Sequence, residues 1–185
     1  MRQLPEREPQ PDFEIERAIT FLVKQIQESG HNPKPVIFHS LRVGVYLFNC
    51  VYPPPIVIAG ILHDLIEDSD TTLAEINDVF GTTVTELVRV NTVNPAIDNR
   101  AEQGRDRIQR CADYGKEALV VMAADMLDNS HYLDPRLDES FARFWVAEKM
   151  YFLEVSHSTL SNEKVWLELY DQCQKLQAAL QRRLF

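Results

Sequence analysis

The chain has 185 residues, of which 45% are apolar and 25% charged, the balance of an ordinary globular protein and not of a disordered one. Its formal net charge of −9 argues against binding to a nucleic-acid polymer, because neutralising a phosphate backbone requires clustered Lys and Arg. No apolar run approaches the roughly 20 residues of a membrane span, and the first residues lack the apolar stretch of a signal peptide, so we expect a cytoplasmic protein with no membrane partner.

The first half of the chain predicts helices separated by proline and glycine breaks. Residues 1–11 carry three prolines and few apolar residues, which indicates a flexible lead-in to one domain over residues 12–185. Asp12 is the expected N-cap of the first helix. The three consecutive prolines before Ile56 and the glycine at position 81 are the clearest breaks. The expected helices cover 13–29, 35–51, 56–68, 72–80 and 82–92.

The second half predicts three more helices, over 116–131, 138–158 and 161–183. Between residues 100 and 110, polar residues and arginines predict either an exposed helix or a mobile crossing. No stretch alternates between apolar and polar residues as a strand would. We therefore expect an all-α, single-domain bundle of about eight or nine helices.

Polar side chains interrupt the most apolar of these helices near its end. The segment GILHDLIED places His63, Asp64, Glu67 and Asp68 within 6 residues. Three carboxylates this close repel one another unless a cation lies among them, and they also oppose the dipole at a helix C-terminus. The segment therefore indicates a bound divalent metal.

Two further polar residues lie in apolar helical surroundings, where an unpaired imidazole or carboxylate is costly. They are His39, in the second helix, and Asp125, which follows an apolar run ending at Ala124. Taken singly, each is also explained by ordinary hydrogen bonding or a helix-end salt bridge. With His63 and Asp64 they form a mixed nitrogen and oxygen ligand set for one divalent metal ion, and this set suits Mn²⁺, Fe²⁺ and Zn²⁺ alike.

The order of these residues resembles the signature of the HD phosphohydrolase superfamily: His39, then His63-Asp64 after 23 intervening residues, then Asp125. Within that superfamily, HDLIEDSDTTLAEINDVFG at 63–81 is similar to the hydrolase domain of RelA/SpoT-type alarmone enzymes and their small stand-alone relatives. The resemblance covers roughly residues 35–155. It implies an HD-type helical bundle and a metal-dependent phosphohydrolase whose substrate is a small-molecule nucleotide, guanosine tetraphosphate or pentaphosphate, cleaved at its 3′-pyrophosphate.

The resemblance also implies roles for individual residues. Glu67 and Asp68 are the expected catalytic residues, which position the attacking water and handle protons. Asn129, in the segment ADMLDN, is expected to order the metal or the ribose side, and Tyr151 is expected to contact the substrate. The expected phosphate-binding cations are Lys34, Arg42 and Lys149.

The chain departs from the family pattern where the nucleotide would be gripped. The family usually has a basic, often paired-arginine segment and a tyrosine shortly before its first histidine, followed by His-Pro, whereas this chain has Lys34, Phe38 and His39-Ser40. One turn before Tyr151 the family typically has an arginine, and this chain has alanine. The candidate substitutes are Arg143 and Lys149.

Three alternatives therefore stay open. The first is an HD-type nucleotidase or phosphomonoesterase that acts on other nucleotides with the same metal and a different pocket. The second is a non-catalytic, metal-binding regulatory module. The third is a helical interaction protein whose amphipathic last helix, 161–183, faces a partner chain instead of the core. A homo-oligomer is compatible with each of them.

Overall fold

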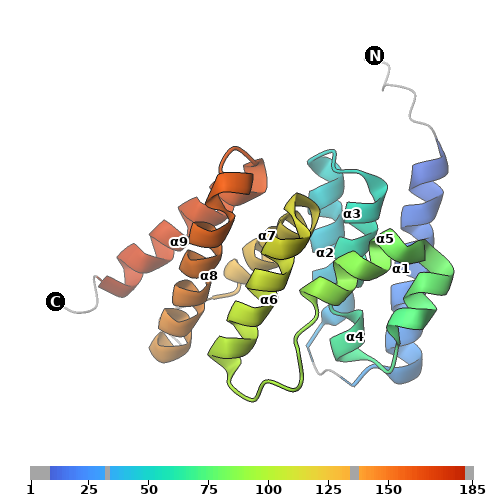
Figure 1. Ribbon diagram of the computed structural model, residues 1–185, viewed down its shortest axis with the longest axis horizontal. Helices are drawn as coiled ribbons and strands as arrows, with labels where there is room; N and C mark the ends of the chain where they lie inside the picture. Colours follow the sequence, from blue (N-terminus) through green and yellow to red (C-terminus); the bar gives the residue numbers. More distant parts are fainter. Residues whose placement is uncertain (1–8, 32–33, 134–137, 182–185) are drawn as a thin grey trace, which may run out of the picture.

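The computed structural model describes residues 9–31, 34–133 and 138–181, and all regular structure in these ranges is helical (Figure 1). The helical segments are α1 Pro9–Ser29, α2 Val36–Asn49, α3 Pro54–Leu62, α4 Leu65–Asp68, α5 Leu73–Asn91, α6 Arg100–Tyr114, α7 Lys116–Ser130, α8 Glu139–Leu160 and α9 Lys164–Gln181. The all-α expectation is confirmed. None of these helices is long and apolar enough to cross a membrane.

Two apolar helices, α3 and α7, form the centre of the bundle. Every residue of α3 from Ile56 to Leu62 is buried, as is every residue of α7 from Ala118 to Leu127. Helix α3 packs against α1, α2, α5 and α7, and α7 also packs against α6, α8 and α9 (Figure 1). A helix that is apolar on every side belongs in the core. Polar residues at the C-terminal ends of these two helices are therefore carried into the interior.

Helices α2 and α3 approach each other closely because each presents a glycine to the other. A Cβ atom on Gly44 would lie 2.3 Å from the Ile61 side chain, and one on Gly60 would lie 2.4 Å from Leu47. Either side chain would have to move to admit a larger residue. This close contact fixes the distance between the helix that carries His39 and the helix that ends beside His63.

The first helix begins at Pro9, earlier than the predicted residue 13, so Asp12 lies in its first turn and is not the N-cap. Prolines are tolerated there because the first N–H groups of a helix have no intrahelical partner. The predicted flexible lead-in, 1–11, therefore extends too far, because residues 9–11 belong to the helix. Residues 1–8 lie outside the described ranges.

The predicted helix over 56–68 is two segments, α3 and α4, joined by His63 and Asp64. Both linking residues keep right-handed helical angles, but the ψ of −5° at Asp64 opens the turn. The Nδ1 atom of His63 is 2.8 Å from the carbonyl oxygen of Gly60. The break turns the His63 side chain toward α2 and α7.

Helix α5 starts and bends as the sequence predicts. Thr72 and Glu75 form a complete capping box, in which each side chain bonds to the backbone N–H of the other residue. Gly81 has a φ of 78°, which separates the segments predicted as 72–80 and 82–92.

The arginine-rich segment after residue 99 is a helix, α6, and not a mobile crossing. The Asn99 side chain caps it by accepting hydrogen bonds from the backbone N–H groups of Ala101 and Glu102. The helix is only partly exposed, because Gly104, Ile108 and Cys111 are buried on the side that packs against α5, α7 and α8. One face of α6 therefore points into the protein.

The last helix, α9, packs its apolar stripe onto α7 and α8, so the predicted stripe mainly serves the core. Leu167 is an exception, with half of its surface exposed. The buried side chains of α9 are Val165, Trp166, Leu169, Cys173, Leu176 and Leu180.

Candidate metal centre

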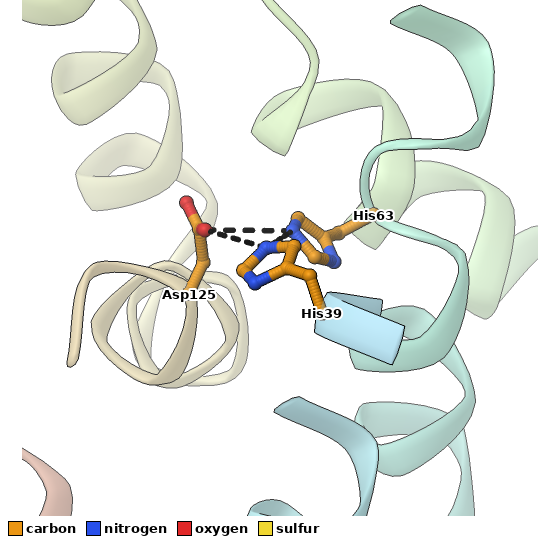
Figure 2. Close-up of side chains that lie close together, drawn as sticks. All are labelled: His39, His63 and Asp125. Carbon is orange, nitrogen blue, oxygen red and sulfur yellow. Dashed lines mark hydrogen bonds and ion pairs between the residues drawn. The ribbon is translucent and has the colours of Figure 1, made fainter. Parts of the chain in front are cut away.

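Three buried side chains from different parts of the chain meet at the centre of the bundle. His39 comes from α2, His63 from the turn between α3 and α4, and Asp125 from α7 (Figure 2). The two Nε2 atoms lie 3.2 Å apart. The Oδ1 atom of Asp125 is 3.2 Å from Nε2 of His39 and 3.5 Å from Nε2 of His63. One metal ion could contact all three.

The fourth predicted ligand, Asp64, borders this cluster. Its Oδ2 atom is 3.6 Å from Nε2 of His39, and its Oδ1 atom is 3.3 Å from Nε2 of His63. The side chain is mostly buried, with 11% of its surface exposed. The structure thus brings the four predicted ligands together.

In each imidazole, the hydrogen bond at Nδ1 determines whether Nε2, the atom that faces the cluster, carries a proton or a lone pair. Nδ1 of His63 faces the carbonyl oxygen of Gly60, and Nδ1 of His39 faces a carboxylate oxygen of Asp128 at 2.8 Å. Both partners are acceptors, so each neutral ring carries its proton on Nδ1 and its lone pair on Nε2. Two nitrogen lone pairs then converge with the Asp125 carboxylate, and only a cation satisfies them. These residues fit a divalent metal ion.

The pKa values show how strongly this cluster attracts positive charge. Burial lowers the pKa of the His63 imidazole, but Asp64 and Asp125 outweigh burial and raise it to about 9. Burial alone would raise the pKa of Asp125, yet the two imidazoles and Arg107 hold it well below its usual range. Without metal, the cluster attracts protons; a bound divalent cation would supply the positive charge in their place.

A cavity of about 450 Å³ opens beside the cluster, between the metal ligands and helices α6 and α8. Its lining combines three kinds of side chain. The polar and acidic ones are Asp64, Glu67, Gln103, Asp125, Asn129 and Glu148; the cations are Lys34, Arg100, Arg107 and Lys149; and the aromatic ones are Tyr132, Phe141 and Trp145. Cations and rings beside a metal cluster suit an anionic ligand that contains an aromatic group.

The two predicted catalytic carboxylates lie differently with respect to this cavity. Glu67 lines it and accepts a hydrogen bond from the backbone N–H of Val93 at 2.7 Å. Burial raises the pKa of the Glu67 carboxyl, the direction that suits a group exchanging protons near neutral pH. Asp68 is buried deeper, and its Oδ2 atom lies 3.7 Å from Nζ of Lys34.

Two predicted substrate-binding residues lie in the cavity wall with defined partners. Asn129 donates from Nδ2 to Oδ1 of Asp125 at 2.6 Å, so it steadies a metal ligand. Lys149 lies 2.8 Å from Glu148 and 4.4 Å above the ring of Trp145. Burial lowers the pKa of the Lys149 ammonium despite the neighbouring glutamate.

Three other predicted residues do not line the cavity. Arg42 makes two hydrogen bonds of 2.7 Å to Asp128, on the far side of His39. Tyr151 lies in the outer face of α8, with the guanidinium of Arg105 above its ring. Arg143 pairs with a glutamate one turn earlier on the exposed side of α8. The position one turn after His39 had suggested Arg42, and the family resemblance had suggested Tyr151 and Arg143, but their side chains lie outside the cavity.

Sequence reasoning missed two residues of the site. Arg107 lines the cavity, and its Nε atom is buried without a hydrogen-bond partner in the described part of the chain. The apolar stripe formed by Gly104, Ile108 and Cys111 could have indicated which of the α6 arginines faces inward. Asp128 lies one turn after Asp125 on α7, a spacing that could have indicated a second carboxylate near the histidines.

Comparison with known proteins gives consistent matches. A family model described as HD domain matches residues 18–127, more than half of the chain. Two curated relatives are both named guanosine-3′,5′-bis(diphosphate) 3′-pyrophosphohydrolase. The protein from Aquifex aeolicus is 32% identical over 124 residues, 65% of this chain and 18% of its own length. The MESH1 protein of Drosophila melanogaster is 29% identical over 110 residues, 57% of this chain and 61% of its own length. The chain thus spans less than two thirds of either relative.

A solved structure has the same fold. It is described as a metazoan ortholog of SpoT that hydrolyses ppGpp, and it superposes with a TM-score of 0.68 at 23% identity, over 88% of this chain and 94% of its own. The family model matches residues 18–127, which include both histidines and Asp125, and the structure brings these three side chains within contact distance of one ion. The chain therefore belongs to the HD domain family.

Proposed function

We propose that this chain is a metal-dependent phosphohydrolase that removes pyrophosphate from the 3′ position of guanosine tetraphosphate or pentaphosphate. One observation carries the proposal: the cavity joins a cluster of converging nitrogen and carboxylate ligands to a wall of cations and aromatic rings. The names of the relatives from Aquifex aeolicus and Drosophila melanogaster supply the substrate.

His39, His63, Asp64 and Asp125 would hold one divalent ion, for which Mn²⁺ is our first candidate. When bound, such an ion lowers the pKa of water and neutralises charge on a phosphate. The hydrogen bond from Asn129 keeps Asp125 turned toward the ligand position.

Glu67 is the residue that we expect to exchange protons with the attacking water and the leaving oxygen. Its carboxylate lines the cavity, and burial raises its pKa, the direction that favours proton exchange near neutral pH. Asp68, the other proposed catalytic residue, lies beside Lys34, whose ammonium is 3.4 Å from Asp64 and 3.7 Å from Asp68. From that position, close to the metal ligand Asp64, Asp68 would help to position the attacking water and to transfer protons.

Cations on both sides of the cavity would bind the phosphates. Lys34, Arg107 and Lys149 are proposed for this role, Lys34 and Lys149 as the sequence suggested and Arg107 from the structure. Arg42 is withdrawn from it, because both of its hydrogen bonds to Asp128 point away from the cavity. The rings of Tyr132 and Trp145 offer stacking surfaces for a base.

The test is a product analysis on the purified chain with Mn²⁺ and guanosine 3′,5′-bis(diphosphate). We expect pyrophosphate and GDP in equal amounts, measured by ³¹P NMR and ion-exchange chromatography. The Glu67→Gln variant, which keeps the shape of the side chain, should bind Mn²⁺ and release no pyrophosphate. Release of inorganic phosphate from other nucleotides, with no pyrophosphate from this one, would favour the HD-type nucleotidase instead.

A further inference from the structure

The side of His39 that faces away from the proposed metal is held by an acid that comes from another helix. Asp128, near the C-terminal end of α7, places Oδ2 at 2.8 Å from Nδ1 of His39. This contact assigns the ring proton to Nδ1 and the lone pair to Nε2, the atom that faces His63 and Asp125. The orientation of one proposed ligand therefore depends on a residue that is itself outside the ligand set.

Asp128 is in turn fixed by Arg42. The guanidinium donates from Nε to Oδ1 and from Nη2 to Oδ2 of Asp128, both at 2.7 Å, in a two-pronged pair. Both oxygens of Asp128 thus take part in hydrogen bonds, and Oδ2 lies between Arg42 and His39.

Arg42 is held by two aromatic rings. Its guanidinium carbon lies 4.6 Å from the centre of the Phe38 ring and 4.7 Å from the centre of the Tyr132 ring. Phe38 is one turn before Arg42 on α2, and Tyr132 is one turn after Asp128, just beyond α7. The guanidinium of Arg42 therefore packs against one ring from α2 and one from the segment that follows α7.

The ion pair with Arg42 matters because the Asp128 side chain borders a second cavity, toward which it could otherwise turn. This cavity, of about 410 Å³, lies along a different face of α7, and Asp128, Tyr46 and His131 are among the residues that line it. A carboxylate at this border could turn toward solvent in the second cavity. The two bonds from Arg42 keep it turned toward His39.

We infer that Asp128 and Arg42 are positioning residues for the proposed metal ligand His39, linked in the order Arg42, Asp128, His39 and metal. The inference rests on the metal site of the proposed function and not on its substrate. A partner that orients a ligating histidine typically contributes 10- to 100-fold to metal affinity. We expect about that loss in Mn²⁺ affinity when Asp128 is replaced by asparagine, which keeps the shape of the side chain and removes its charge.

The experiment measures Mn²⁺ binding by electron paramagnetic resonance of the free ion, with the whole chain and no nucleotide. Glu86→Gln is the matched control, because Glu86 also pairs with an arginine: its Oε2 atom accepts hydrogen bonds from Nε and Nη2 of Arg89, at 2.9 and 2.7 Å, on the exposed side of α5. Asp128→Asn should bind Mn²⁺ about 10- to 100-fold more weakly than Glu86→Gln. Equal affinities in these two variants would overturn the inference.

A double-mutant cycle tests whether Arg42 acts through Asp128. Arg42→Met should weaken Mn²⁺ binding in the natural background and leave it unchanged in the Asp128→Asn background. Arg42→Lys keeps the charge but lacks the planar fork that makes two parallel bonds; it should show an intermediate loss and serves if the methionine variant does not fold. Equal losses from Arg42→Met in both backgrounds would contradict the proposed order.

His39→Ala separates failure of the inference from failure of the metal site. Loss of Mn²⁺ binding in His39→Ala, with none in Asp128→Asn, would overturn the positioning role and leave the metal site intact. Unchanged binding in His39→Ala would overturn both. Ligand-field absorption of the Co²⁺-loaded chain adds a second measurement, since a reoriented His39 ring should change the spectrum of Asp128→Asn and not that of Glu86→Gln.

Discussion

The two ends of the substrate cavity are built from different parts of the fold. The metal-facing end uses α2, α7 and the turn after α3, and its side chains are almost fully buried, with 3% of the His63 side chain exposed. The opposite wall uses α6, α8 and residues outside the helices, and Phe141 there is 38% exposed. The side chains at the first end are buried in the core, whereas the second end also contains side chains that are exposed to solvent.

This difference indicates which properties of the site can change independently. A change at the metal-facing end disturbs helices that also hold the hydrophobic core, so the ligand set and the fold are coupled. In the wall, Lys149 and Trp145 are also buried, but exposed side chains such as Tyr132 and Phe141 can be exchanged at smaller cost to packing. We infer that the metal chemistry is the rigid part of this protein, while the choice of nucleotide resides in the wall.

The largest expected effect comes from removing an imidazole at the metal-facing end. His63→Ala should abolish both Mn²⁺ binding and pyrophosphate release, since it removes a ligand from a buried cluster. His157→Ala is the control, because His157 contacts only the ring of Trp166 among the aromatic residues described and lies on α8. Calorimetric titration with Mn²⁺ measures the difference. A His63→Ala protein with natural affinity would remove His63 from the ligand set.

The next effect separates chemistry from metal binding at the same end. Glu67→Gln should lower kcat by about 10²- to 10⁴-fold, the usual contribution of a general acid or base, with Mn²⁺ affinity close to that of the natural chain. Steady-state kinetics and elemental analysis of the same sample measure the two quantities. If kcat survived this substitution, another group would have to exchange the proton.

At the opposite wall the expected effect is on substrate affinity. Arg107→Gln should raise KM by about 10- to 100-fold, the loss of one charged hydrogen bond to phosphate, and should change kcat less. Arg105→Gln is the matched control on the same helix, because Arg105 is exposed over the ring of Tyr151, outside the cavity. Equal KM values in the two variants would show that Arg107 does not bind the phosphates.

The same contrast explains what the sequence could predict. The core helices α3 and α7 were predictable because they are apolar on every side, and His63 and Asp125 stood out because polar groups are costly in such surroundings. The wall was harder to predict. Arginines occur on several sides of α6, and only packing through Gly104 shows that Arg107 faces inward.

Arg42 illustrates a different limit. Its position one turn after His39 suggested a shared environment, which is correct, but the partner that decides its role is 86 residues away in the sequence. No local pattern relates Arg42 to Asp128. Contacts between side chains on separate helices are set by how α2 and α7 cross, and a hydrophobic period does not give that angle.

The smallest expected effect concerns competition between protons and metal at the rigid end. The folded-state pKa of His63, about 9 without metal, lies above its ordinary value of 6.5. Protonation of His63 therefore stabilises the metal-free fold fully below about pH 6.5, and this contribution is lost as pH rises through about 9. Metal binding requires the unprotonated ring, so Mn²⁺ stabilises most where the protons have left.

The difference in Tm between the Mn²⁺-loaded and metal-free chain should accordingly widen from pH 6 to pH 9, as measured by differential scanning calorimetry at fixed Mn²⁺ concentration. His157→Ala should show the same widening, because that side chain lies outside the cluster. His63→Ala should show little difference at any pH. A difference in Tm that narrowed with rising pH in the natural chain would mean that protons and metal do not compete for the same nitrogen atoms, and the metal would then have to be placed elsewhere.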